Sequence, residues 1–230
     1  MADKQYQILG DLIYNSLITT KNNPTEEIFA ESFTNAIESF LEKADGTTVD
    51  KGTISSGVYA GVGTLDSIKG NISICKQTIL DTCIQLKTVF KDSNSILASS
   101  MAEGIYKLGF NGKFKYKSDG VVSHGNTSTP LKGDMEGNFT INQTLLFTSL
   151  KSLFLSFNVR SNETLENYNK RLNIGTIFTD SDESFAYKFA DILQPILSVG
   201  VVSTKGKEVL EGVSGTGVLL FKEKEEKLDG

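Results

Sequence analysis

The stretch FAESFTNAIESFLEKADGTTV, residues 29–49, contains the transition that decides the fold. Its apolar side chains recur at the spacing of one helical face, and they are Phe29, Phe33, Ile37, Phe40 and Leu41. This periodicity predicts an amphipathic helix that ends near Ala44. From Asp45 to Gly63 the composition changes to Gly, Thr and Val, which favours a β-hairpin or an extended arm.

A second helix is predicted upstream of this stretch. Residues 3–21 place Tyr6, Leu9, Ile13 and Leu17 on one face. The polar segment at 21–24 separates the two helices. We expect Asn23 to be the N-cap of the second helix and Pro24 to take its first helical position.

The same order of elements recurs further along the chain. A helix is predicted over 71–91, and a polar break at 92–94 leads to a second helix with Leu97, Met101, Ile105 and Leu108 on one face. Phe114 and Tyr116 then alternate with lysines over 113–117, which indicates a strand with one solvated face. We interpret residues 120–137 as a Gly-rich loop.

A third round begins near residue 138. A helix is predicted over 142–157, followed by a short polar helix around Leu165, Tyr168 and Leu172. A further helix extends from Phe185 to Ile196, and we expect Pro195 to kink or end it. Two or three short strands are predicted between 199 and 221, before a charged tail.

Several sequence matches indicate an internal repeat. Phe29-Ala30 with Phe33 and Ile37 corresponds to Leu97-Ala98 with Met101 and Ile105, and to Phe185-Ala186 with Phe189 and Leu193. Residues 70–74 resemble 137–141, and each segment is followed by a Gln-Thr-Ile/Leu-Leu phrase. Gly61-Val62-Gly63 and Gly215-Thr216-Gly217 occupy similar places. We therefore predict an α+β fold of internally repeated helix–helix–β-hairpin units that pack together, with units 1–64, 65–140 and 141–221 and a tail 222–230.

The size of one unit has a physical consequence. A helix pair with a hairpin, ~65–80 residues, makes only a marginal core alone, so neighbouring units are expected to pack together. The β segments look polar and Gly-rich, and their edges need a partner from a neighbouring unit or another subunit. We expect a homo-oligomer in which 45–63 is the intersubunit arm.

Composition excludes several classes of protein. The net charge of −5 argues against nucleic-acid binding, which needs a basic surface. The amino terminus lacks the pattern of a signal peptide, and no run reaches the ~18 apolar residues of a membrane span. These features predict a protein made in a cytoplasm. Cys75 and Cys83 lie too far apart on one predicted helix to form a disulfide, and we interpret them as core residues.

No motif for catalysis or cofactor binding is recognisable. His124 is the only histidine, and it lies in a polar segment that we interpret as a solvated loop. Gly57, Gly61 and Gly63 lack the Gly-Lys-Ser/Thr ending of a phosphate-binding loop. A predicted helix start carries three acidic residues, Asp180, Asp182 and Glu183. Their negative charges interact favourably with the positive end of the helix dipole. The sequence predicts no enzyme, no catalytic, cofactor-binding or metal-binding residues, and no cofactor.

The first unit resembles a known class of protein. A helix with Phe33, Ala36, Ile37 and Phe40 is followed by Thr47-Thr48-Val49 and then Gly61-Val62-Gly63. This order resembles small virion structural proteins of tailed bacteriophages, mainly over 28–64 and more loosely over 97–137 and 185–221. The resemblance implies a tail, neck or baseplate component in the virion, made in the host cytoplasm. Its implied partners are further copies of itself and other virion proteins, without nucleic acid, membrane or cofactor.

The alternative is a cellular adaptor or a binding module of a surface or secretion system. Genes for portal, sheath or tape-measure proteins beside this one would favour the virion.

Overall fold

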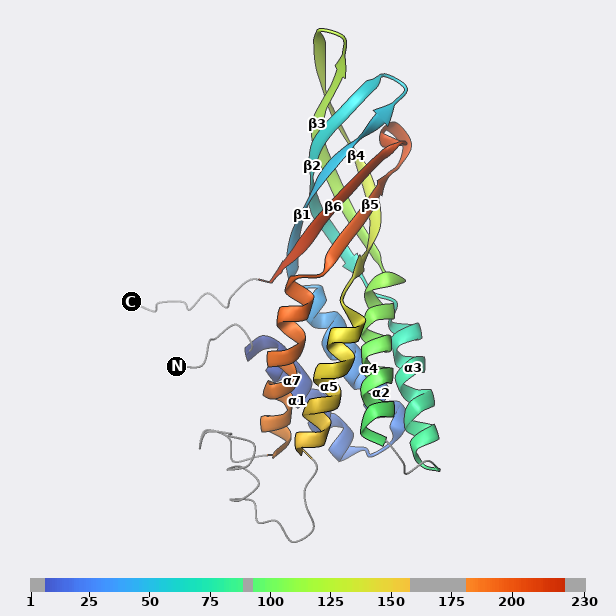
Figure 1. The fold of residues 1–230 in the computed structure, drawn as a ribbon, viewed down its shortest axis with the longest axis vertical. Helices are drawn as coiled ribbons and strands as arrows, with labels where there is room; N and C mark the ends of the chain where they lie inside the picture. Colours follow the sequence, from blue (N-terminus) through green and yellow to red (C-terminus); the bar gives the residue numbers. More distant parts are fainter. Residues whose placement is uncertain (1–6, 89–92, 158–180, 222–230) are drawn as a thin grey trace, which may run out of the picture.

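The computed structural model describes residues 7–88, 93–157 and 181–221. Helices and strands alternate in pairs along the chain (Figure 1). The first group contains α1 (Gln7–Asn22), α2 (Glu26–Leu41), β1 (Ala44–Ile54) and β2 (Gly57–Lys69). The second contains α3 (Ile72–Leu86), α4 (Ser93–Phe110), β3 (Lys113–His124) and β4 (Thr127–Thr140). The third contains α5 (Gln143–Phe157), α7 (Ser181–Ser198), β5 (Val201–Gly206), a 3-10 turn (Glu208–Leu210) and β6 (Val213–Phe221).

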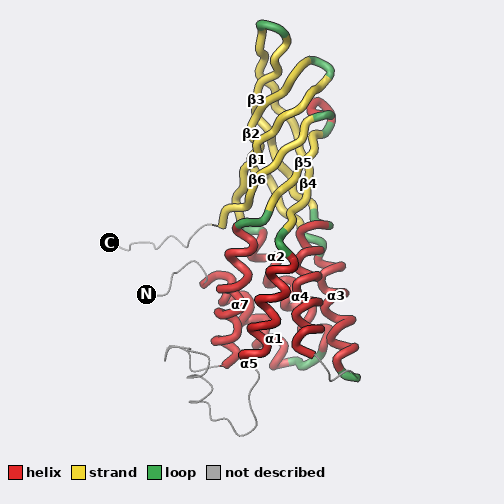
Figure 2. Tube along the Cα trace, in the orientation of Figure 1, coloured by secondary structure: helices red, strands yellow, loops and turns green. Residues whose placement is uncertain are grey.

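The helices and the strands form two stacked parts of one elongated molecule. The helices pack side by side in a closed ring, in the order α1, α2, α3, α4, α5 and α7, with α7 returning to α1. The three hairpins form a closed antiparallel barrel above this ring (Figures 1 and 2). Since each group supplies one helix pair and one hairpin, the chain has approximate threefold symmetry about its long axis.

The predicted α+β fold of repeated helix–helix–hairpin units is therefore confirmed. The first predicted boundary, between 64 and 65, falls inside β2, whereas the second, between 140 and 141, coincides with the end of β4. The buried apolar residues of the three groups form one cluster, so the units share a core. The predicted polar helix at 165–172 and the tail 222–230 lie outside the described residues.

The second helices of the three groups bury the same positions. Phe33 and Ile37, Met101 and Ile105, and Phe189 and Leu193 are all almost fully buried, as the repeat predicts. Three alanines precede them at equivalent positions and are completely buried: Ala30, Ala98 and Ala186. A small residue at this position brings the helices close together around the axis.

One local prediction about helices was wrong, and one of the two alternatives in a second was wrong. The N-cap of α2 is Thr25, whose hydroxyl accepts the N–H of Ile28 at 3.2 Å, so the helix begins two residues later than expected from Asn23. Thr is itself a good cap. In addition, α7 continues through Pro195 to Ser198, so the proline does not end the helix.

The barrel closes because β1 pairs with β6 as well as with β2. Asp50, for example, lies opposite Gly61 on β2 and Gly215 on β6. The edges of each hairpin thus pair with strands of the neighbouring units. The sequence predicts a neighbouring unit or another subunit as the partner, and the structure shows the first. Residues 45–63 form part of the barrel wall, and their main chain is not a free arm for another subunit.

The interpretation of residues 120–137 as a loop was wrong, because these residues continue β3 and form most of β4. The narrow interior of the barrel, its lumen, explains why strands with so many glycines resemble a loop in sequence. Large inward side chains such as Tyr59 and Tyr116 fill it, and glycines lie opposite them. A Cβ atom on Gly46 would lie 2.9 Å from the Tyr116 hydroxyl, so this glycine gives the ring its space. The strands therefore bury large apolar and aromatic side chains, contrary to the expected polar character.

One of the sequence matches was also wrong. Residues 70–74 enter α3, whereas 137–141 lie mainly in β4. The structural equivalent of Asn71 is Asn142, which precedes α5 as Asn71 precedes α3. With this alignment, Cys75 corresponds to Leu146 and Ile79 to Leu150, and all four are completely buried.

Candidate functional site: a buried polar layer in the barrel

Three polar residues lie at equivalent positions on the first strands of the three hairpins. Asp50-Lys51-Gly52 on β1, Ser118-Asp119-Gly120 on β3 and Thr204-Lys205-Gly206 on β5 each combine a buried polar residue, an exposed charged residue and a glycine. Because side chains alternate along a strand, the first member of each tripeptide points into the lumen. Asp50 is completely buried there.

Glycines flank each of these polar residues on both neighbouring strands. Asp50 lies opposite Gly61 and Gly215, Ser118 lies opposite Gly63 and Gly133, and Thr204 lies opposite Gly137 and Gly215. Thr48, two residues before Asp50, also has glycines on both sides, Gly63 and Gly217. The side chains of this polar layer therefore have room across the lumen that larger neighbours would occupy.

A hydrogen-bonded chain connects three of the side chains. The Ser118 hydroxyl donates to Asp50 Oδ2 at 2.5 Å, and it lies 2.9 Å from the Tyr59 hydroxyl. Since the single proton of Ser118 is used toward Asp50, the Tyr59 hydroxyl donates to Ser118. The carboxylate thus receives one hydroxyl donor, Ser118, on Oδ2, and Tyr59 acts on it only through Ser118.

The rest of the layer has no hydrogen-bond partner within the part of the chain that the structure describes. The orphaned atoms in the barrel are Asp50 Oδ1, Thr48 Oγ1, Thr204 Oγ1 and the Tyr116 hydroxyl. Each is buried from solvent. Buried polar atoms without partners cost free energy and are rare in folded proteins.

Burial and the carboxylate act together on the nearby phenols. Burial raises the pKa of Tyr116 above its ordinary value, and the negative charge of Asp50 raises it further. Burial also raises the pKa of Tyr59, partly offset by the hydrogen bond with Ser118, and Asp50 adds to the increase. Both hydroxyls therefore stay protonated across the physiological range. The layer supplies oxygen atoms and hydroxyl donors, and its chemistry is that of a polar binding site.

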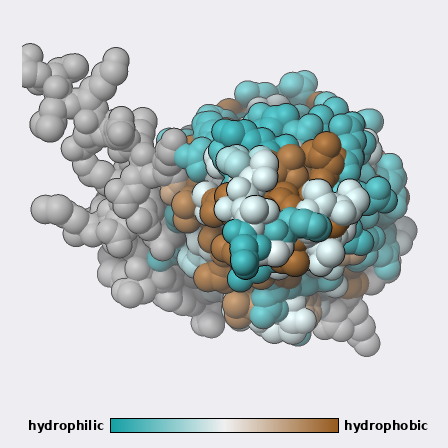
Figure 3. Space-filling view, turned by 90° about the horizontal axis from the view of Figure 1, so that it is seen from above, coloured by the Kyte–Doolittle hydropathy of each residue, from teal (hydrophilic) through white to brown (hydrophobic). Residues whose placement is uncertain are grey.

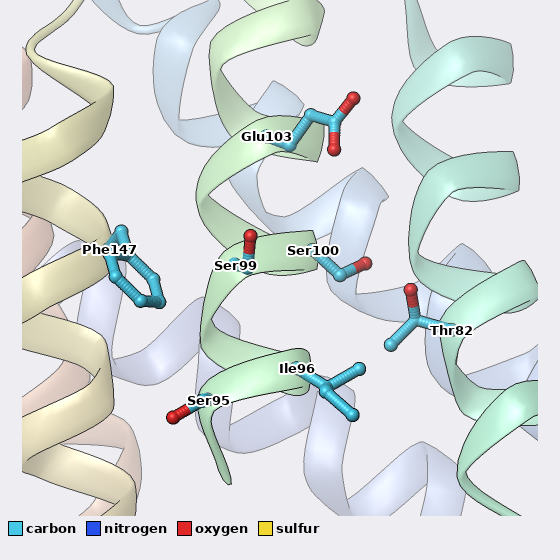
Figure 4. A pocket seen from close by; sticks show the side chains of 7 residues that line it. All are labelled: Thr82, Ser95, Ile96, Ser99, Ser100, Glu103 and Phe147. Carbon is cyan, nitrogen blue, oxygen red and sulfur yellow. The ribbon is translucent and has the colours of Figure 1, made fainter. Parts of the chain in front are cut away.

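A cleft in the helical part lies over α4, between α3 and α5, with a volume of ≈ 410 Å³ (Figure 4). Its polar groups serve the helices themselves. The Ser100 hydroxyl donates to the carbonyl of Thr78 at 2.9 Å, and Glu103 pairs with Lys107 at 2.6 Å. The lining residues include no histidine or cysteine.

The residues considered from the sequence as possible catalytic or ligand-binding groups do not lie together in the structure. His124 is exposed at the end of β3, and its carbonyl accepts the Thr127 hydroxyl at 2.9 Å. Asp182 lies in the first turn of α7 and pairs with Lys21 at 3.2 Å, while Asp180 lies outside the described residues. Gly61 and Gly63 lie inside β2. In the described ranges, no three His, Cys, Asp or Glu side chains are grouped to hold a metal ion.

The cysteines belong to the helical part. Cys75 is completely buried, and burial raises the pKa of its thiol to about 11, partly offset by the hydrogen bond from Thr34. Cys83 is half-buried, and its pKa is raised for the same reason.

Sequence reasoning missed the polar layer. The signal available was the repeated order of an inward polar residue, a charged residue and glycine in 50–52, 118–120 and 204–206. It becomes recognisable only when the strands and their inward faces are known.

Comparison of the chain with protein-family models, with curated proteins and with solved structures found no match.

Proposed function

We propose that this chain is a non-enzymatic structural component of a tailed-phage virion, in the tail, neck or baseplate, which acts through contacts with copies of itself and with other virion proteins. The observation that carries the proposal is the approximate threefold symmetry of a single chain. Three similar units around one axis offer three similar surfaces to any partner that repeats threefold around the same axis. Simultaneous contacts of this kind add up to strong binding even when each is weak.

The end and the wall of the barrel offer the surfaces for these contacts. Apolar side chains lie between polar ones when the molecule is viewed from above (Figure 3). On the barrel wall, Val49 and Val62 face each other across β1 and β2 and are 58% and 52% exposed. Leu220 on the adjoining β6 is 55% exposed. Exposed apolar groups on adjacent strands are typical of contact surfaces.

The non-enzymatic part of the proposal rests on the sequence, in which no catalytic motif is recognisable. The buried carboxylate of Asp50 is enclosed by the barrel, where a substrate has no described access. The outer wall carries exposed ion pairs, such as Lys117 with Asp134 at 2.6 Å, in which the two charges cancel.

Among the described helices, none combines the length and the apolar character that a membrane span requires.

Fractionation of phage particles tests the proposal. Particles from cells that carry the gene are purified by density gradient, and the protein is quantified by mass spectrometry against the main capsid protein. We expect it to sediment with the particles in a fixed ratio, and deletion of the gene to abolish infectivity. If the protein stays with host complexes and the deletion leaves infectious particles, the cellular adaptor or secretion-system module is favoured instead.

A surface variant tests the mode of action. Val49→Lys places a charge in the apolar part of the wall, and Thr53→Lys places the same charge at another exposed position of β1. We expect Val49→Lys to reduce incorporation into particles and self-association, measured by light scattering, while Thr53→Lys does not. Equal incorporation of both variants would exclude this wall as the contact surface.

A further inference from the structure

The buried carboxylate of Asp50 lacks a counter-charge. It is completely buried, and no lysine or arginine is among the buried residues of the described chain. Ser118 and Tyr59 supply dipoles to one side of the carboxylate, but neither cancels its charge. An ionised carboxylate in such surroundings is stable only when a positive charge accompanies it.

The unpartnered oxygens surround this carboxylate on the sides where the glycines lie. A Cβ atom added to Gly63 would meet both Thr48 Oγ1 and Asp50 Oδ2, the latter at 2.7 Å. A Cβ atom added to Gly215 would collide with both Asp50 Oδ1 and Thr204 Oγ1. Each glycine thus lies against both a carboxylate oxygen and a threonine hydroxyl, and no hydrogen bond joins the two oxygens of either pair.

The donor set selects the kind of ligand. One carboxylate and several hydroxyl oxygens, without sulfur or imidazole, are the ligands of a hard cation. A single buried negative charge is neutralised by a single positive charge, whereas calcium sites use several carboxylates. A monovalent ion also supplies partners to oxygens whose lone pairs are otherwise unused.

We propose that the barrel binds one monovalent alkali cation, coordinated by Asp50 together with the hydroxyls of Thr48 and Thr204. The ion enters as the barrel closes around it, so it is a structural part of the folded chain. This departs from the sequence-based prediction of no metal site, which rested on the absence of the His and Cys clusters of transition metals. It is independent of the proposed virion role.

The test compares the full chain in different salts at constant ionic strength. Samples are unfolded and refolded in NaCl, KCl or choline chloride, and Tm is measured by circular dichroism. Constant ionic strength keeps the screening of surface charges unchanged. In NaCl or KCl, at a concentration about 100-fold above Kd, we expect Tm to exceed that in choline by roughly 5–10 °C. The same Tm in all three salts would overturn the proposal.

Two variants distinguish ion binding at Asp50 from effects of salt on the charged outer surface. Asp50→Asn removes the charge with little change of shape, and we expect it to lose the dependence on the alkali salt while remaining at least as stable in choline as the native chain. Asp119→Asn is the matched control, because Asp119 lies on the outer face of β3, where it pairs with Lys132 at 2.5 Å. It should keep the full salt response. A salt response that persists in Asp50→Asn would show that the ion binds elsewhere.

A direct measurement covers the case in which Asp50→Asn fails to fold. Crystals of the native chain grown in RbCl should show an anomalous peak at bonding distance from Asp50 and the two threonines. Thr204→Val, which removes one hydroxyl and keeps the shape, should weaken the salt response. A barrel without such a peak would contradict the proposal.

Discussion

Asn71 and Asn142 perform the same task one unit apart. The side-chain oxygen of Asn71 accepts the N–H of Ile74 at 3.2 Å, and that of Asn142 accepts the N–H of Leu145 at 3.0 Å. Each cap fixes the point where the chain leaves the barrel and enters a helix of the ring. The repeat therefore includes the junction between the two parts of the molecule.

Loss of these caps is expected to destabilise the protein at both junctions. Asn71→Ala and Asn142→Ala should each lower the free energy of unfolding by about 1 kcal/mol, because a backbone N–H loses its partner. The two effects should add in the double variant, since the sites are separate. Urea unfolding provides the measurement, and Asn126→Ala, in the exposed β3–β4 turn, serves as the control with little effect expected. No loss of stability in either cap variant would contradict the assigned role.

Two leucines of α5 test the helical core. Leu150 is completely buried and Leu155 is 55% exposed. Leu150→Ala should cost about 2–5 kcal/mol because it leaves a cavity between packed helices, whereas Leu155→Ala should change stability by less than about 0.5 kcal/mol. Chemical denaturation of both variants measures the difference. Equal effects would mean that α5 presents a different face to the ring.

The contact between Gly46 and Tyr116 tests the packing of the lumen. A methyl group on Gly46 meets the Tyr116 hydroxyl, so Gly46→Ala should destabilise the barrel by about 1–3 kcal/mol. Tyr116→Phe removes a buried hydroxyl without a hydrogen-bond partner in the described structure, and its own effect should be small. In the double variant we expect Tyr116→Phe to recover part of the loss, as measured by a double-mutant cycle. Strict additivity would show that the two positions do not interact.

Glu38 makes stability depend on pH. It is almost fully buried at the end of α2, and its Oε1 accepts the N–H of Gly70 at 2.7 Å. Burial raises the pKa of Glu38 above its ordinary 4.5, partly offset by this hydrogen bond. Between the unfolded and the folded pKa, the native state binds more protons than the unfolded state, so ionisation of Glu38 lowers stability as pH rises through this range.

Glu38→Gln removes this titration and keeps an acceptor for Gly70. Relative to the native chain, the variant should gain stability as pH rises from below 4.5 to neutrality. Parallel urea titrations across this range measure the difference, and Glu211→Gln, at an exposed position in the barrel part, is the control. A constant difference between Glu38→Gln and the native chain at all pH values would exclude Glu38 as the titrating group.

The helical ring was predictable because its pattern is conventional. Residues such as Phe33, Ile105 and Leu193 recur at helical spacing and point to a wide, shared core. Parts of β1 and β2 reverse the usual pattern of a half-buried strand. In Gly61-Val62-Gly63 the valine is exposed and the glycines face the lumen, and in Val49-Asp50 the charged residue is the buried one. Large inward side chains such as Tyr59 and Tyr116 fill the lumen, so glycines take inward positions beside them, and these stretches resemble loops in composition.

The residues at the junctions between strands and helices were also difficult to align from the sequence. Asn71 and Asn142 are equivalent, but the local resemblance of residues 70–74 to 137–141 is more conspicuous and leads to the wrong alignment. Only the position where a strand gives way to a helix identifies the correct one. The polar layer depends on three strands that are far apart in the chain, and no local pattern reveals that they meet.

The pairing of β1 with β6 also sets the timing of biosynthesis. β1 leaves the ribosome early, yet the strand that completes its ladder ends at Phe221. At a translation rate of about 5–20 residues per second, β1 waits on the order of ten seconds or more for this partner. Throughout that interval its main-chain donors and acceptors form an open edge, on which another nascent chain can add a strand. The open edge of β1 is removed only when β6, the last strand, has emerged and paired with it.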